Sequence, residues 1–138
     1  MNYFDHEKLD VYKVAIAIVI LIEEVVNQLP RGRAYLADQL QRAGTSIPLN
    51  IAEGAGEYSE GEKIRFYRMA RRSATECASI FDICQQLNLI NEKQFQSSRD
   101  LLLRVVAMLT RMSRISHESG SGSQTGSFTK ISKETSKL

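Results

Sequence analysis

The chain has 138 residues, of which 43% are hydrophobic and 25% charged, and its formal net charge is +2 at pH 7. This length predicts one domain whose core needs neither disulfides nor a metal, and the composition is typical of a soluble globular protein. A net charge this small gives no argument for nucleic-acid binding by itself.

The first predicted helix runs from about Lys8 to Gln28, after an extended lead-in in which Phe4 is expected to contact the bundle. Its inward stripe uses Tyr12, Ala15, Val19, Ile22 and Val26. A second apolar set falls outside that stripe: Ile16, Ile18, Ile20, Leu21 and Val25. Because a bundle covers only one side of each helix, we expect this set to form an oligomer interface. Cover by the lead-in or the C-terminal tail remains the alternative.

The second predicted helix occupies about residues 33–53, with apolar residues three or four apart from Leu36 to Ile51. Gly54 and Gly56 are expected to end it in the left-handed geometry of a C-terminal cap. Glu53 is expected to form a structural ion pair with Arg65, or to cap the next helix. This interpretation is preferred to a catalytic pair with Asn50.

The third and fourth predicted helices run to about Asn88 and Ser113. Ser59 and Glu62 have the spacing of a capping box, and Asn91 with Gln94 repeats the signature. Heptad-like apolar spacing and short connections then predict an all-α, up-and-down antiparallel four-helix bundle over residues 1–116.

Positive charge gathers in the second half of the chain. Residues 1–60 carry five Lys/Arg and nine Asp/Glu, a balance of −4, whereas residues 61–116 carry ten and five, a balance of +5. This asymmetry permits an acidic partner. It equally permits attraction between the two halves within a bundle or an oligomer, and the sequence leaves both interpretations open.

The candidate phosphate-binding residues are Arg65, Arg68, Arg72, Arg104 and Arg111. The first three follow one edge of the third helix, and the other two are seven residues apart on the fourth. We expect the fourth-helix pair to lie towards the opposite end from Arg65, so that only a ring of subunits would repeat each cluster into a charged band. Binding would be non-specific and salt-dependent. The alternative is a set of solvated helix faces with ion pairs between subunits.

Residues 117–138 form a Gly/Ser-rich tail that we expect to be flexible and disordered in isolation. Lys130, Lys133 and Lys137 would add weak phosphate attraction there. The preferred interpretation is that the tail aids solubility.

Nothing in the sequence predicts an enzyme, a cofactor or a metal site. His6 and His117 lie at the edges of the predicted bundle, without ligand partners. Cys77 and Cys84 are seven residues apart on one helix, about 10 Å along its axis, so they cannot bridge each other and are expected to be buried free thiols. The absence of a signal peptide and of a membrane-length apolar run predicts a cytoplasmic protein.

One string of the second helix carries a family resemblance, namely Ser46-Ile47-Pro48-Leu49-Asn50-Ile51-Ala52-Glu53-Gly54. Together with Arg42-Ala43 upstream and Phe66, Ala70, Ser73 and Glu76 downstream, it resembles the four-helix bundle family of 23S rRNA intervening-sequence proteins. The resemblance covers about residues 4–113. It marks Arg42, Ser46, Pro48, Asn50, Glu53 and Gly54 as motif residues with structural roles.

The resemblance implies a non-enzymatic, pentameric ring of four-helix bundles, with nucleic-acid binding as the suggested activity. That family is similar to the accessory variability proteins of diversity-generating retroelements, so the alternative is a protein-interaction scaffold with a reverse transcriptase as partner. The chain departs from the family pattern at Arg72, which is expected to alter the surface of the third helix. It also departs at Gly44-Thr45, which is expected to loosen packing nearby.

Overall fold

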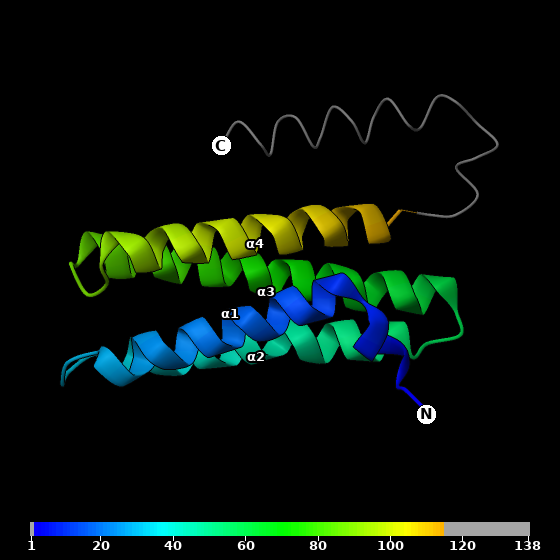
Figure 1. Cartoon of the computed structure of the whole chain (residues 1–138), viewed down its shortest axis with the longest axis horizontal. Coiled ribbons are helices and arrows are strands. Elements are labelled where there is room, and N and C mark those ends of the chain that lie inside the picture. The colour runs from blue at the N-terminus through cyan, green and yellow to red at the C-terminus, as the bar shows by residue number, and fades with distance from the viewer. Residues whose placement is uncertain (1, 115–138) are drawn as a thin grey trace, which may run out of the picture.

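A computed structural model of the chain describes residues 2–114 and shows a bundle of four long helices (Figure 1). The elements are η1 (Asp5–Lys8), α1 (Asp10–Gln28), α2 (Ala34–Ala55), α3 (Glu60–Gln86) and α4 (Glu92–Met112). The expected tail, residues 117–138, lies outside the described residues.

Each helix packs against two neighbours: α1 and α3 both contact α2 and α4. Successive helices run in opposite directions, so η1, the α2–α3 turn and the end of α4 all lie at one end of the bundle (Figure 1). The predicted all-α, up-and-down four-helix bundle is therefore confirmed.

Local hydrogen bonds explain where α3 and α4 begin. The Ser59 hydroxyl accepts a bond from the Glu62 amide at 3.3 Å, as predicted, but Glu62 does not complete a box because its carboxylate binds Arg65. Asn91 and Gln94 form a complete capping box. These caps satisfy amides that a helix leaves without an internal partner.

The end of α2 differs from the prediction. The helix continues to Ala55, and Gly56 at its C-cap has φ −86°, so no left-handed residue ends it. Instead the Lys63 ammonium donates to the carbonyl oxygens of Gly54 and Ala55, at 3.0 and 3.1 Å. A cation beside these carbonyls is favoured because the C-terminal end of a helix carries partial negative charge.

The inward face of α1 also differs from the prediction. Ile18, Leu21 and Val25 are buried in the core of the single chain, with Ile18 fully covered, so they are not free to form an oligomer interface. The buried stripe of α1 comprises Val11, Val14, Ala15, Ile18, Leu21, Ile22 and Val25. Of the predicted interface set, only Ile16 and Ile20 remain exposed, at 37% and 65%.

Two glycines of α2 allow close contact between helices. At Gly44 the Cδ1 atom of Ile22 from α1 occupies the space of a missing side chain, so this position tightens the packing that it was expected to loosen. At Gly54 a Cβ would lie 2.7 Å from the ring of Tyr67, a residue that is only 4% exposed. Gly54 therefore serves the approach of α3 to α2.

Replacing Gly54 by alanine tests this role. The new Cβ would meet the Tyr67 ring and lie 3.2 Å from the Lys63 carbonyl oxygen. Overpacking costs about 1–3 kcal/mol, and the better helix propensity of alanine returns about 1 kcal/mol. We expect Gly54→Ala to lower the free energy of unfolding in urea by up to about 2 kcal/mol. The control Gly56→Ala, whose nearest contact would be at 3.6 Å, should change it by less than about 0.5 kcal/mol; equal effects would contradict the assignment.

The predicted free thiols are confirmed: Cys77 and Cys84 are both buried and unbridged. Burial raises the pKa of the Cys77 thiol to about 12, and the neighbouring Glu76 carboxylate adds to the effect. Burial also raises the pKa of Cys84. Both groups are held in the neutral form, which suits a close-packed core and not a reactive thiolate.

This raised pKa predicts a loss of stability in alkali. The folded protein keeps the Cys77 proton up to about pH 12, whereas the unfolded chain loses it near the ordinary value of 9.0. The neutral Cys77 thiol thus contributes fully to the free energy of unfolding below pH 9, and this contribution is lost as the pH rises towards 12. The free energy of unfolding should fall less steeply above pH 9 in Cys77→Ala than in the parent protein. Parallel curves would show that this thiol does not carry the effect.

Candidate functional site

One hydrogen bond shows the register of α3 against α4. The Arg71 guanidinium donates to the Thr110 hydroxyl at 3.4 Å. Since the two helices are antiparallel, residues just before and after Arg71 lie beside the last turn of α4. The expectation that Arg111 lies at the opposite end from Arg65 is therefore wrong: the start of α3 and the end of α4 are neighbours.

Five arginines lie at the level of this contact along the bundle. They are Arg68, Arg71 and Arg72 on α3, with Arg111 and Arg114 at the end of α4, and we name them the arginine cluster. All lie within four residues of the contact, which is about 6 Å along a helix axis. The cluster thus exists within one chain, without the ring of subunits that the sequence was expected to need.

The two stretches of sequence that hold the arginine cluster contain no carboxylate. Residues 63–75 and 101–114 hold seven arginines, one lysine and no Asp or Glu. Among the described residues, Arg68, Arg72 and Arg111 are exposed and none of them pairs with a carboxylate. Their guanidinium groups are therefore directed to solvent, where phosphate oxygens can reach them.

The other two predicted residues stand apart from the arginine cluster. Arg65 forms an ion pair with Glu62 at 2.8 Å and lies over the Phe66 ring. The hydrogen bond that the Arg65 guanidinium donates to the Glu62 carboxylate raises the pKa of Arg65 and lowers the pKa of Glu62. Arg104 is exposed, but it lies two turns before Arg111 on α4. The predicted binding residues did not include Arg71 and Arg114, although the antiparallel direction of the hairpin was enough to place them.

The motif residues of α2 form a polar link to α3. The Asn50 amide donates to the Ser46 carbonyl and hydroxyl oxygens at 2.8 and 2.9 Å. The Ser73 hydroxyl of α3 donates to the same Ser46 hydroxyl at 2.8 Å. Pro48 is buried within the unbroken helix. This part of the motif therefore holds two helices together.

Two motif residues lie on the surface. Glu53 and Arg42 are exposed. The expected ion pair between Glu53 and Arg65 is absent, because the described ion pair of Arg65 is with Glu62. Glu53 is thus available at the surface of α2.

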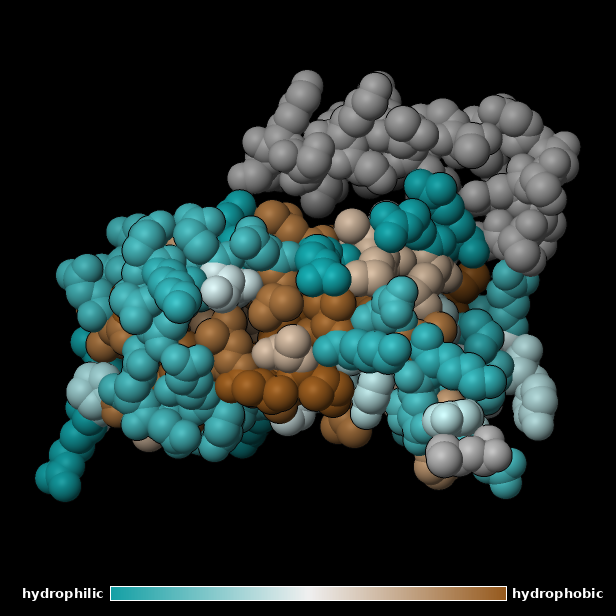
Figure 2. Space-filling view, in the orientation of Figure 1, coloured by the Kyte–Doolittle hydropathy of each residue, from teal (hydrophilic) through white to brown (hydrophobic). Residues whose placement is uncertain are grey.

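An apolar area covers the middle of the face that α1 and α4 form. Figure 2 shows hydrophobic side chains across this region, with hydrophilic ones towards both ends. Ile16 and Ile20 are the large exposed apolar side chains of α1. They lie four residues apart and hence on the same side of the helix. This is the part of the predicted interface that the core leaves uncovered.

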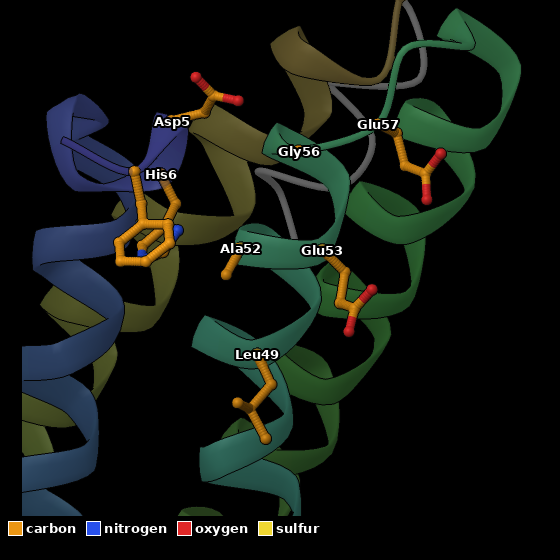
Figure 3. A pocket seen from close by; sticks show the side chains of 8 residues that line it. Asp5, His6, Leu49, Ala52, Glu53, Gly56 and Glu57 are labelled. Carbon is orange, nitrogen blue, oxygen red and sulfur yellow. The ribbon is translucent and has the colours of Figure 1, made fainter. Parts of the chain in front are cut away.

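A groove lies between η1 and the last turns of α2, with a volume of about 370 Å³. Figure 3 shows Asp5 and His6 on its η1 side, and Leu49, Glu53 and Glu57 on its α2 side. Phe4 also lines it and is 72% exposed, which corrects the expectation that this residue is held by the bundle. The groove thus combines carboxylates with exposed apolar side chains.

The described residues offer no further constellation. Across residues 2–114, no three His, Cys, Asp or Glu side chains come together in an arrangement that could hold a metal ion. In the same range, no helix has both the length and the apolar character needed to cross a membrane. The arginine cluster, the apolar area and the groove remain as the candidate sites.

Comparison with known proteins agrees with the fold. Residues 7–111 match a family described as 23S rRNA-intervening sequence protein. A similar solved structure is that of a protein of unknown function from the S23 ribosomal protein family of Bacteroides thetaiotaomicron VPI-5482. It has a TM-score of 0.70 at 20% identity, over 76% of this chain and 99% of that one. No curated protein matches this chain.

Proposed function

The chain belongs to the 23S rRNA-intervening sequence protein family, and from this premise we propose that it binds the phosphate backbone of nucleic acids through the arginine cluster. The observation that carries the proposal is the Arg71–Thr110 contact, because it brings the arginines of two helices to one end of one chain. Phosphate contacts of this kind position a protein on RNA or DNA without reading its sequence.

Charge and shape both support this proposal. Neighbouring exposed arginines on two packed helices offer planar donors that can each hold two phosphate oxygens. Residues 63–75 and 101–114 contain no Asp or Glu, so these two stretches carry positive charge only. Binding should therefore weaken steeply as salt rises, since each neutralised phosphate releases counterions.

Neutralising three arginines tests the proposal. A triple variant that combines Arg68→Gln, Arg72→Gln and Arg111→Gln should lose three phosphate contacts. The slope of log K against log salt should then become shallower by about 2–3, at about 0.7–0.9 for each contact. Fluorescence anisotropy with a labelled RNA hairpin and a labelled single-stranded DNA, over 50–200 mM salt, measures this slope.

The matched control removes the same charge elsewhere. Lys8, Lys13 and Arg42 are exposed cations outside the arginine cluster. The control is a triple variant that combines Lys8→Gln, Lys13→Gln and Arg42→Gln, and it has the same net charge as the test variant. Its slope should stay within about 0.5 of the parent value, because these side chains make no phosphate contact in the proposal. If both variants change the slope equally, binding follows net charge alone and the cluster is not the site.

We also propose that the chain self-associates through the exposed apolar area of α1, as the family resemblance implies. Ile16 and Ile20 would be covered by a neighbouring copy, which removes apolar surface from water. The assembly would repeat the arginine cluster around a ring and raise the number of phosphate contacts made together.

Two neighbouring isoleucines separate association from folding. Ile20 is 65% exposed and Ile18 is 0% exposed. In Ile20→Asp a carboxylate would be buried only in the assembly, so we expect smaller particles by light scattering and an unchanged helical circular dichroism signal. Ile18→Asp should instead unfold the chain, because an unpaired carboxylate in the core costs several kcal/mol. A full-sized assembly of Ile20→Asp would refute the interface.

A protein-interaction scaffold is the second candidate function. The observation that favours it is the same apolar area on α1, which suits a partner protein as well as another copy. A reverse transcriptase is the partner that the resemblance suggests. If light scattering finds single chains that bind no nucleic acid at 50 mM salt, this second function becomes the better account.

A further inference from the structure

The groove between η1 and α2 combines two chemistries that call for one kind of occupant. Asp5, Glu53 and Glu57 supply carboxylates, and Phe4 and Leu49 supply apolar surface that is 72% and 64% exposed. The lining contains no Lys or Arg. A matching occupant therefore presents cations next to an apolar side chain, because carboxylates favour nearby cations and the exposed apolar surface favours cover.

The same chain carries a segment of this kind outside the described residues. Residues 128–133 read Phe-Thr-Lys-Ile-Ser-Lys, with two apolar and two basic side chains and no acidic one. This composition complements the groove in both respects: Lys130 and Lys133 match the carboxylates, and Phe128 and Ile131 match the exposed Phe4 and Leu49.

The length of the chain allows the contact. The helices α2 and α4 are parallel, so the groove and the last turn of α4 lie at the same end of the bundle (Figure 1). Two diagonal helices of a four-helix bundle are about 11–14 Å apart, given neighbours at 8–10 Å. The 14 residues from Arg114 to Phe128 span at most about 46–50 Å, which is enough to pass around α1 or α3.

We propose that residues 128–133 of the same chain occupy the groove between η1 and the end of α2. The two lysines lie against Glu53, Glu57 and Asp5, while Phe128 covers Phe4 and Leu49. Because the segment is tethered, its effective concentration at the groove is in the millimolar range, so a weak contact is enough to fill it. The tail therefore has a docking site on the bundle, beyond the solubility role expected from its composition.

The proposal is independent of nucleic-acid binding. The groove lies on η1 and α2, whereas the arginine cluster lies on α3 and α4. The contact can thus be tested on the full chain without nucleic acid, and failure of one proposal leaves the other standing.

Zero-length coupling of carboxylates to lysines by a carbodiimide tests the contact. We expect mass spectrometry of the full chain to find Lys130 or Lys133 joined to Asp5, Glu53 or Glu57. Mixing chains of natural and ¹⁵N isotopic composition identifies the partner, and the joined residues should belong to one chain. Glycine ethyl ester, added in parallel, should label Glu53 and Glu57 and so report that these carboxylates react.

Two variants separate docking from random collisions of a tethered segment. Phe128→Ser keeps every reacting group but removes the apolar anchor, and should lower the coupling yield at least fivefold. The control Thr129→Ser should leave the yield within twofold of the parent. Unchanged coupling in Phe128→Ser would overturn the proposal, as would labelled carboxylates without any coupling to Lys130 or Lys133. Coupling only between chains of different isotope content would also overturn it, since the occupant would then be another copy.

Discussion

The antiparallel packing of α4 on α3 is the constraint on which the surface of this molecule depends. It places the end of α4 beside the start of α3, and the Arg71–Thr110 hydrogen bond shows how far along they meet. Arginines that are about 40 residues apart in the chain, such as Arg68 and Arg111, thereby come to one end. A parallel or shifted arrangement of the same helices would scatter them.

The same bundle also sorts charge between its two halves. The first half, with α1 and α2, carries the excess of carboxylates, and the second half, with α3 and α4, carries the excess of cations. At the end where η1 lies, this difference appears as the groove with Glu53 and Glu57 on one side and the arginine cluster on the other. Two surfaces of opposite charge suit two different partners, and each proposal uses one of them.

The helices were predictable because apolar residues recur every three or four positions and because Ser59 and Asn91 mark starts. The core face of α1 was not predictable, since a helix that is apolar nearly all round does not show which side is inward. Ile18 was therefore wrongly placed outside the inward stripe. The position of Arg111 was predictable in principle: the antiparallel direction of the hairpin was predicted correctly, but the end of α4 was wrongly placed away from the start of α3. The groove needed tertiary structure, because Phe4 and Leu49 are 45 residues apart.

Binding of the full chain to a labelled RNA hairpin across a salt series tests the central claim most directly. If the arginine cluster holds phosphates, log K should fall linearly with log salt. The slope should be about −2 or steeper, and binding should be strongest at 50 mM salt. An absence of binding at 50 mM salt by a correctly folded chain would contradict the account.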